Sequence, residues 1–328
     1  MNQLYPLKFH PLFKEKIWGG SMIKTHLGLD FSPLPNCGEA WIMSGVENYQ
    51  TVVSEGWLAG NELNELVRIF MDELVGVEVY EKHGEEFPLL IKLINSNDWL
   101  SLQVHPDDEF AKKTGIGSGK SEMWYVLQAD KGAEIINGFK HKVDKDTFVS
   151  HLEAGSLDNI LNTEKVTAGD VFHLPAGRVH ALGPGILLAE IQQTSDNTFR
   201  ISDWDRVDSQ GNSRELHLTQ ALEVMNLEVY PDYRTHYKAS IDKAIPLVSS
   251  PYFTTNLLQL SKPLSKNHGE LDSFVIYLCI SGAAEIHCAN STASLKAGEC
   301  VLVPAIINKT IIIPTAEVHL LEVYIAVD

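Results

Sequence analysis

The feature that most restricts the fold of this chain is an internal repeat of two related segments. Residues 125–136 read YVLQADKGAEII and residues 276–287 read IYLCISGAAEIH, each an extended run, a turn and a second run. Further along, VTAGDVFHLPAGRVH at 166–180 corresponds to LKAGECVLVPAIINK at 295–309. Short apolar runs separated by glycine-containing turns are typical of β-sandwiches and β-barrels. Because the pattern occurs twice, we predict a mainly β chain with two related β-barrels and a few packing helices.

The length of the chain agrees with two units. Its 328 residues are many for one compact core. A polar, proline-containing stretch that ends near Pro246 separates the two repeats. We therefore predict a first domain of residues 1–240, which carries helical inserts, and a smaller β-rich second domain of residues 241–328.

Helical and hairpin patterns complete the expected architecture. In residues 61–76, apolar side chains recur with helical spacing between Asn61, a candidate N-cap, and Gly76, a candidate stop. This helix is expected to pack on the sheets and to carry no chemistry. Residues 122–128 and 133–137 are separated by a glycine-containing turn, so they are expected to pair as a β-hairpin.

Charge, cysteine spacing and hydropathy exclude several classes of protein. The formal net charge of −17 disfavours nucleic acids and anionic membrane surfaces as partners. No apolar run approaches the roughly 20 residues that cross a bilayer, and the first residues lack a signal peptide's apolar segment. The four cysteines have no CxxC spacing, which indicates buried free thiols rather than disulfides or a sulfur-rich metal site. We expect a cytoplasmic protein, with an oligomeric state that the sequence leaves undetermined.

Residues 99–125 carry three polar side chains that suit a metal ion. Gln103 and His105 are two positions apart in a strand-like run, so their side chains share one face. Glu122 opens the next apolar run, and His180 in the later repeated segment is a candidate fourth ligand. An amide, two imidazoles and a carboxylate form a coordination shell for a borderline divalent metal. Such a shell leaves positions open for substrate, as catalytic metal sites do.

The segment that contains His180 has a recognisable spacing. From Gly169 to His180 it reads glycine, five residues, proline, one residue, glycine, two residues and histidine. This spacing resembles the second sequence motif of the cupin barrels, whose fold is a double-stranded β-helix or jelly roll. Both units are therefore expected to be cupin-like β-barrels.

The two copies of the repeat differ at the ligand positions. Aligning the glycine-containing segments places His180 on Lys309. Aligning the earlier segments places Glu122 on Ser273. Since neither replacement matches the proposed ligand, only the first barrel is expected to hold a metal ion.

Four motifs occur in a fixed order along the first unit. They are QVHPDD at 103–108, GKSEMWY at 119–125, PAGRVHAL at 175–182 and QQTSDNTFR at 192–200. Together they resemble the type I mannose-6-phosphate isomerases, also called phosphomannose isomerases, in their short bacterial form. The ordered motifs cover about residues 4–210, and the last unit matches only by its barrel pattern. The chain lacks most of the helical domain inserted in the longer members, so the lid over the pocket is undetermined.

The resemblance implies a role for individual residues. It implies Zn²⁺ as cofactor, with the ligands Gln103, His105, Glu122 and His180. It implies a catalytic group of Arg200, Lys120 and Asp196. It implies contacts to a phosphorylated hexose from Lys92, Trp18 and Glu39, the last two in the segments KIWGG and GEAW.

The reaction implied by the resemblance is an aldose–ketose isomerisation. A proton leaves C2 of mannose 6-phosphate, a cis-enediol forms, and a proton is returned at C1 to give fructose 6-phosphate. This chemistry needs an electrophile and a base. Zinc suits the first role, with Arg200 to stabilise negative charge. The base is open between Lys120, since a desolvated lysine near other cations releases its proton more readily, Asp196 and a zinc-bound hydroxide.

Two other functions fit part of the pattern. A cupin metal-dependent oxygenase would use a similar barrel with iron, but the glutamine ligand and the lack of an HxH pair disfavour it. A sugar-binding module without turnover would need no set such as Lys92, Lys120 and Arg200. The phosphosugar isomerase is therefore the prediction.

Overall fold

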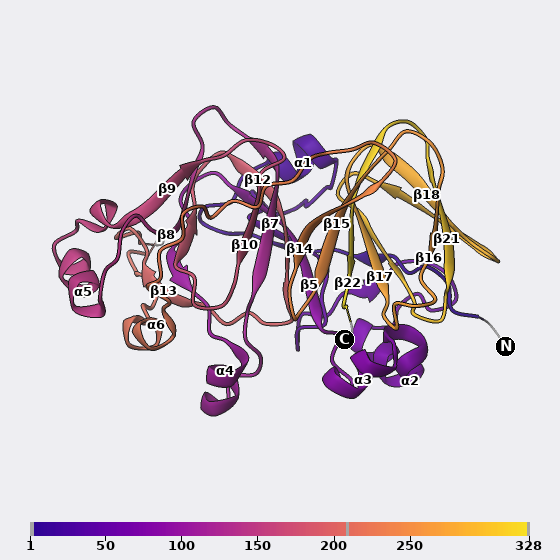
Figure 1. Cartoon of the computed structure of the whole chain (residues 1–328), viewed down its shortest axis with the longest axis horizontal. Coiled ribbons are helices and arrows are strands. Elements are labelled where there is room, and N and C mark those ends of the chain that lie inside the picture. The colour runs from indigo at the N-terminus through magenta and orange to yellow at the C-terminus, as the bar shows by residue number, and fades with distance from the viewer. Residues whose placement is uncertain (1–2, 208–209, 327–328) are drawn as a thin grey trace.

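The computed structural model describes residues 3–207 and 210–326, and β-strands dominate it (Figure 1). The strands form two sheets in each half of the molecule, which we call the N-terminal and the C-terminal sheet pair. The prediction of a mainly β chain is confirmed. The count of two closed barrels and the domain boundary at residue 240 stay predictions.

The N-terminal sheet pair consists of a six-stranded and a five-stranded sheet. The six-stranded sheet has the order β10 (Val171–Leu174), β7 (Glu122–Ala129), β12 (Ile186–Gln193), β5 (Leu89–Ser96), β3 (Glu39–Met43) and β2 (Leu12–Lys14). The five-stranded sheet has the order β13 (Phe199–Ser202), β6 (Leu102–Val104), β11 (His180–Leu182), β8 (Glu134–Phe139) and β9 (Leu161–Lys165).

The C-terminal sheet pair consists of a five-stranded and a four-stranded sheet. The five-stranded sheet has the order β14 (Ala244–Ser249), β15 (Thr254–Leu260), β22 (Val318–Tyr324), β17 (Val275–Ser281) and β20 (Cys300–Val303). The four-stranded sheet has the order β16 (Leu264–Asn267), β21 (Lys309–Pro314), β18 (Ala283–Cys288) and β19 (Ser291–Lys296). A separate pair is formed by β1 (Phe9–His10) and β4 (Val52–Val53).

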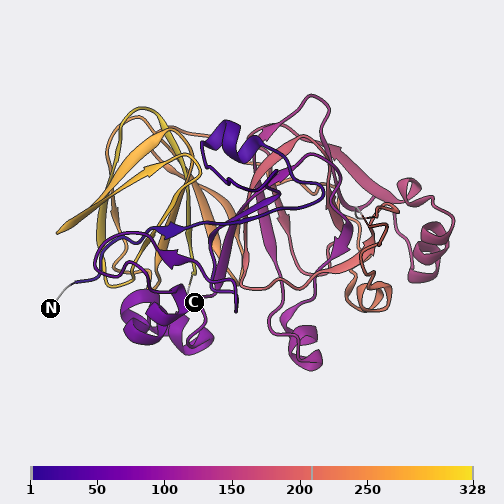
Figure 2. The same ribbon diagram turned by 180° about the vertical axis from the view of Figure 1, so that it is seen from behind.

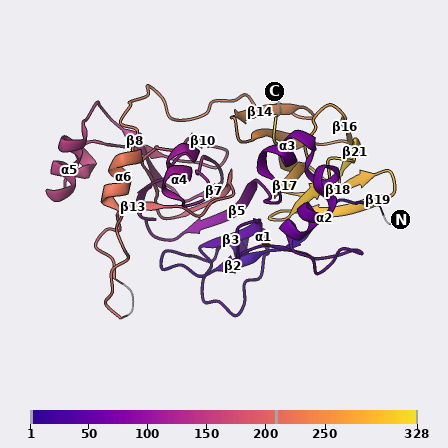
Figure 3. The same ribbon diagram turned by 90° about the horizontal axis from the view of Figure 1, so that it is seen from below.

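The helices lie outside the sheets (Figures 1 and 3). They are α1 (Met22–Leu27), α2 (Leu63–Val75), α3 (Val77–His83), α4 (Asp108–Thr114), α5 (Lys145–Glu153), the 3₁₀ turn η1 (Leu157–Asn159) and α6 (Leu218–Val224). Helices α5 and α6 lie at the N-terminal sheet pair, while α2 and α3 lie below the C-terminal pair (Figure 1). None of the helices in the described ranges is long and apolar enough to span a membrane.

Each sheet pair encloses its own apolar core. Trp124 of β7 and Leu182 of β11 belong to one cluster of buried side chains between the N-terminal sheets. Tyr277 of β17 and Ile286 of β18 belong to the corresponding cluster between the C-terminal sheets. Because side chains alternate along a strand, the residues between these core positions point to the outer face of each sheet, where they can pack against other elements.

The outward faces of the sheets bury further apolar side chains. Tyr125 and Ile191 of the six-stranded sheet share a cluster with Ile276 and Leu321 of the C-terminal pair, which fixes the two halves together. The N-terminal segment adds to this joint, since Leu7 exchanges two backbone hydrogen bonds with Leu302 of β20 at 2.8 and 2.9 Å. Figure 2 shows this segment crossing between the halves.

The hairpin prediction for residues 122–128 and 133–137 is wrong. Strand β7 pairs with β10 and β12, whereas β8 pairs with β11 and β9 in the opposite sheet. The turn between them carries the chain across the core, where Val126 and Ile135 pack in the same cluster. Sharing an apolar interior therefore outweighs the local pairing that the short turn would allow.

The helix predicted in residues 61–76 is confirmed with small changes. It runs from Leu63 to Val75, and Glu62 rather than Asn61 occupies the N-cap position. Gly76 follows its last turn, as expected. Met71 has a φ of 46° and a side chain that is 46% exposed, so the predicted apolar stripe is interrupted there.

Candidate metal centre and active site

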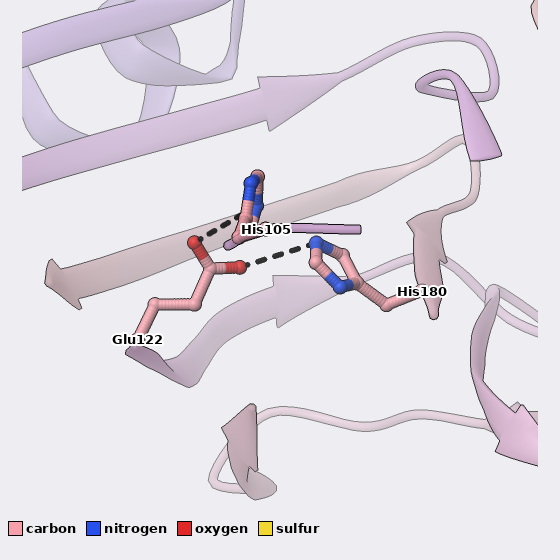
Figure 4. A group of neighbouring side chains, drawn as sticks. All are labelled: His105, Glu122 and His180. Atoms are coloured by element: carbon pink, nitrogen blue, oxygen red, sulfur yellow. Dashed lines mark ion pairs between the residues drawn. The ribbon is translucent and has the colours of Figure 1, made fainter. Parts of the chain in front are cut away.

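His105, Glu122 and His180 converge inside the N-terminal sheet pair (Figure 4). Glu122 is the first residue of β7 and His180 the first of β11, so they come from opposite sheets, and His105 directly follows β6. Glu122 Oε1 lies 3.3 Å from His180 Nε2, and Glu122 Oε2 lies 3.5 Å from His105 Nε2. One ligand atom from each residue lies within 4.8 Å of the others. The predicted ligands are therefore brought together.

Gln103 borders this cluster through the sheet ladder. It lies opposite His180 on one side and opposite Arg200 on the other. Its Nε2 lies 3.2 Å from His180 Nε2, and its Oε1 accepts a hydrogen bond from Ser101 Oγ at 3.3 Å. Directly opposed residues of neighbouring strands share one face, so Arg200, Gln103 and His180 form one row.

Backbone carbonyls orient both imidazoles toward the cluster. His105 Nδ1 lies 2.8 Å from the carbonyl oxygen of Asn197, and His180 Nδ1 lies 2.9 Å from that of Arg178. A proton on each Nδ1 donates to the carbonyl, so the Nε2 lone pair points at Glu122. Burial lowers the pKa of His105 well below its usual value and that of His180 to about 4. The neutral imidazole, which is the form that ligates metals, is thereby favoured.

Glu122 is the most constrained member of the cluster. Its side chain is fully buried, and neither of its oxygens accepts a hydrogen bond from any described residue. Burial raises the pKa of this carboxyl group, and the nearby charge of Glu190 raises it further. The Lys120 ammonium group, 3.1 Å from Oε2, offsets part of this effect. An ionised carboxylate without hydrogen bonds is costly to bury, and a divalent cation would offset this cost.

The donor set fits zinc on these observations. Two imidazole nitrogens and one carboxylate match the ligand types of a catalytic zinc site, and the Gln103 amide lies beside them. The buried, unbonded Glu122 oxygens supply the negative charge that the ion requires. Hydrogen bonds from the outer ring nitrogens to carbonyls are the usual support of metal-ligating histidines.

A second polar row lies beside the cluster, and of its members only Lys92 was predicted as a site residue from the sequence. Lys92, a predicted substrate contact, is only 3% exposed and lies 3.0 Å from Glu190 Oε1. It also donates to Gln192 Oε1 at 2.6 Å, while Trp124 Nε1 donates to Glu190 Oε2 at 2.9 Å. Gln192 lies opposite Glu122 in the ladder. Glu190 and Gln192 are polar residues two positions apart in the apolar run of β12. This spacing indicates that both side chains point to the same face of the sheet, and it was the sequence signal for this row.

Arg200 and Asp196 lie on the segment that leads into and through β13. Arg200 Nη1 donates to the carbonyl oxygen of Glu215 at 2.7 Å, and its buried Nε has no partner among the described residues. Asp196 is exposed, and its charge acts on Lys92 and on Lys14. Asp196 therefore lies close to Lys92 and Lys14, and Arg200 lies in the row of Gln103 and His180.

Trp18 and Glu39 occupy different surroundings. Trp18 is 3% exposed and packs in the apolar core between the N-terminal sheets. Glu39 pairs with Lys16 at 3.0 Å and accepts a hydrogen bond from Trp41 Nε1 at 2.8 Å. Burial would raise the pKa of Glu39, but Lys16 and Lys92 lower it to about 2. Glu39 is thus ionised and already engaged by neighbours, and substrate contacts from both residues stay proposals.

The ladders correct the predicted alignment of Glu122. Leu174 and Val303 each precede the repeated proline; Leu174 lies opposite Glu122, and Val303 lies opposite Val275. Glu122 therefore corresponds to Val275, two residues from the predicted Ser273. The reason is that the loops that flank these strands differ in length between the two sheet pairs. An alignment of the two sequences without gaps cannot account for this difference.

The predicted match of His180 to Lys309 is also shifted. Lys309 is exposed, while Thr310 is buried and points into the core. Thr310 lies opposite Lys266, just as His180 lies opposite Gln103. The C-terminal pair thus has lysine, valine and threonine at three of the four ligand positions, and only His268, two residues after Lys266, matches its counterpart His105.

Comparisons with known proteins agree with this geometry. Residues 6–142 match the model of the phosphomannose isomerase type I catalytic domain. A mannose-6-phosphate isomerase of Streptococcus mutans is 36% identical over 301 residues, which cover 91% of this chain and 92% of that protein. The chain belongs to the mannose-6-phosphate isomerase family. The isomerase ManA of Bacillus subtilis, another member, is 36% identical over 305 residues, 91% of this chain and 93% of that protein.

Solved structures of mannose-6-phosphate isomerases share the fold. The crystal structure of the Bacillus subtilis isomerase superposes with a TM-score of 0.85 at 31% identity, covering 97% of this chain and 99% of that one. A zinc-bound mannose 6-phosphate isomerase has a TM-score of 0.78 at 18% identity, with 98% and 100% coverage. At that identity, the second likeness concerns the fold alone.

Proposed function

We propose that this chain is a zinc-dependent aldose–ketose isomerase that interconverts mannose 6-phosphate and fructose 6-phosphate through a cis-enediol. The observation that carries the proposal is the cluster of two neutral imidazoles and a buried, unbonded carboxylate in a member of this isomerase family. Its four cysteines are free thiols, which fits the reducing cytoplasm that we propose as its location.

The metal ligands in this proposal are Gln103, His105, Glu122 and His180. Zinc is favoured by the donor set, and a zinc-bound relative with the same fold supports it. Gln103 would ligate through its oxygen after a half-turn of the amide, which now directs nitrogen toward His180. Bound zinc would act as a Lewis acid that polarises the substrate oxygens at C1 and C2.

Lys120 is the proposed proton-transfer residue. Its Nζ lies 3.2 Å from His105 Nε2 and 3.1 Å from Glu122 Oε2, and the residue is 4% exposed. It can therefore reach a substrate carbon held beside the ligands, since a general base must come within hydrogen-bond distance of the proton. Asp196 is the alternative base. Its carboxylate is exposed and has no ion pair with any described residue, so it can accept a proton without first breaking one.

Arg200 is the proposed stabiliser of the charge that develops on the enediol oxygens. Its place beside Gln103 in the ladder and its unpartnered Nε leave donor capacity toward the pocket. A guanidinium group that is already oriented costs no reorganisation when the charge develops. Lys92, neutralised by Glu190, is proposed as a contact to the sugar, together with Trp18 and Glu39.

Metal analysis and one coupled assay test the function. The purified chain is expected to contain zinc, to convert mannose 6-phosphate, and to lose both properties on chelation. An intact zinc site without turnover of either hexose phosphate would reject the isomerase proposal.

Solvent isotope exchange tests the base separately. Lys120→Ala is expected to stop the exchange of deuterium from C2 of labelled substrate while zinc stays bound. Exchange at the native rate in this variant would exclude Lys120 and leave Asp196 and a zinc-bound hydroxide, of which Asp196→Asn examines the first in the same assay.

A further inference from the structure

Lys14 differs from Lys16, Lys92 and Lys120 in that it has no counter-ion among the described residues. Its ammonium group has no ion pair or hydrogen bond with any residue in the described ranges. An ammonium group that a carboxylate already neutralises has little attraction left for another anion. The neutralised pairs are Lys16 with Glu39 at 3.0 Å, Lys92 with Glu190 at 3.0 Å and Lys120 with Glu122 at 3.1 Å.

Two aromatic rings hold the Lys14 ammonium group in place. Its Nζ lies 3.2 Å from the ring centroid of Trp41 and 3.9 Å from that of Tyr49. Lys92 Nζ lies 5.1 Å from the same Trp41 ring, so this indole connects Lys14 to the polar row beside the metal ligands. Ring faces attract a cation without using its N–H groups, which stay available for a ligand.

Lys14 also lines a cavity of about 670 Å³. Its lining includes three aromatic side chains, Phe13, Phe31 and Tyr49, and two glutamates, Glu47 and Glu62, but none of the proposed metal ligands. This volume is typical of a small-molecule site. Burial lowers the pKa of Lys14 to about 8, and the charges of Asp196 and Glu39 oppose a larger fall. Lys14 is therefore a cation at neutral pH, at the wall of a cavity of small-molecule size.

We propose that Lys14 binds the phosphate group of the hexose phosphate, an inference that rests on the proposed isomerase function. The reacting carbons and the phosphate are at opposite ends of this substrate, so the phosphate-binding cation must lie away from the ligands. Arg200, also without a carboxylate partner among the described residues, neighbours Gln103 and lies at the reacting end. Lys14 lies on β2, at the edge of the other sheet. An ammonium group binds phosphate through charge-assisted hydrogen bonds.

Steady-state kinetics of Lys14→Met, Lys14→Arg and Lys145→Met test the assignment. Lys145, an exposed lysine at the start of α5, is the matched control for loss of one positive charge. For Lys14→Met, the KM for mannose 6-phosphate and the Ki of inorganic phosphate, measured as a competitive inhibitor, are each expected to rise by at least about tenfold, with kcat nearly unchanged. Lys14→Arg and Lys145→Met are expected to keep both constants near the native values.

The outcomes separate this inference from the proposed function. A native enzyme that does not convert mannose 6-phosphate would reject the function itself. An active native enzyme whose Lys14→Met variant keeps the native phosphate Ki would overturn the assignment of Lys14 alone. Zinc content and circular dichroism equal to the native values show that the variant is folded, and Lys14→Arg gives a second reading if the methionine variant does not fold.

Discussion

The buried ion pair between Lys92 and Glu190 allows a quantitative test of how this site is stabilised. Both side chains are 4% exposed, and the Nζ to Oε1 distance is 3.0 Å. Burial alone would lower the pKa of Lys92, but Glu190 raises it above the usual value. Glu190→Gln would leave the ammonium group in a dry site without its paired carboxylate, with only the more distant charges of Glu39, Asp196 and Glu122 acting on it. Removing one partner of a buried pair typically costs about 3–5 kcal/mol, which is the loss expected here.

A double-mutant cycle isolates the pair. Lys92→Met is expected to destabilise the protein by a similar amount, because it leaves the Glu190 carboxylate buried and unpaired. The double variant Lys92→Met/Glu190→Gln contains no buried charge at this position, so it is expected to be more stable than either single variant. The coupling free energy should therefore reach about 3 kcal/mol, the upper end of the usual range for contacting residues.

Urea unfolding with a chelator present measures the cycle without a contribution from bound metal. The exposed pair of Lys24 and Asp30 is the control, since its two charges lie at 2.9 Å but in solvent. The changes in the free energy of unfolding caused by Lys24→Met and Asp30→Asn are expected to be additive. If the Lys92 and Glu190 variants were also additive, the buried pair would not be an energetic unit and the reasoning would fail.

Three further predictions concern activity. His180→Gln is expected to lower zinc content and kcat/KM by more than about 100-fold, beyond the 10–100-fold typical of outer-shell changes, as metal analysis and kinetics would show. The KM of the native enzyme should rise above about pH 8, because the Lys14 cation is present below its pKa of about 8 and lost above it; Lys14→Arg should abolish this rise. Arg200→Lys should lower kcat by at least about tenfold with little change in KM, because a lysine cannot reproduce the planar donor fork.

The convergence of the four candidate ligands was predictable because spacing along strands fixes the direction of side chains. Gln103 and His105 are two positions apart, and His180 opens a strand after a turn of fixed length, so each side chain enters the core. Glu122, at the start of β7, follows the same rule from the opposite sheet. Alternation and turn length are local properties, and a single sequence records them.

The partners of these residues were not predictable in the same way. Glu190 neutralises Lys92 only because β12 and β5 are neighbours in the sheet, 98 positions apart in the sequence. Lys14 becomes notable only when Trp41 and Tyr49 enclose it. Both features depend on the order of the strands in the sheets. The wrong hairpin prediction shows that apolar runs and turns alone do not determine this order.

The C-terminal sheet pair clarifies why only one copy of the repeat can need a metal. Glu322 of β22 corresponds to Glu190, since it lies between Tyr277 and Asn256 as Glu190 lies between Trp124 and Lys92. Both copies thus bury a glutamate, and each supplies a lysine for it: Lys92 in the first, and Lys266 at 2.8 Å from Glu322 in the second. The difference is the second buried carboxylate, Glu122, which has Lys120 nearby but no hydrogen bond within the described residues. With valine in its place, the C-terminal copy balances its buried charge with a lysine alone. The N-terminal copy keeps a second buried carboxylate, which a bound cation would stabilise.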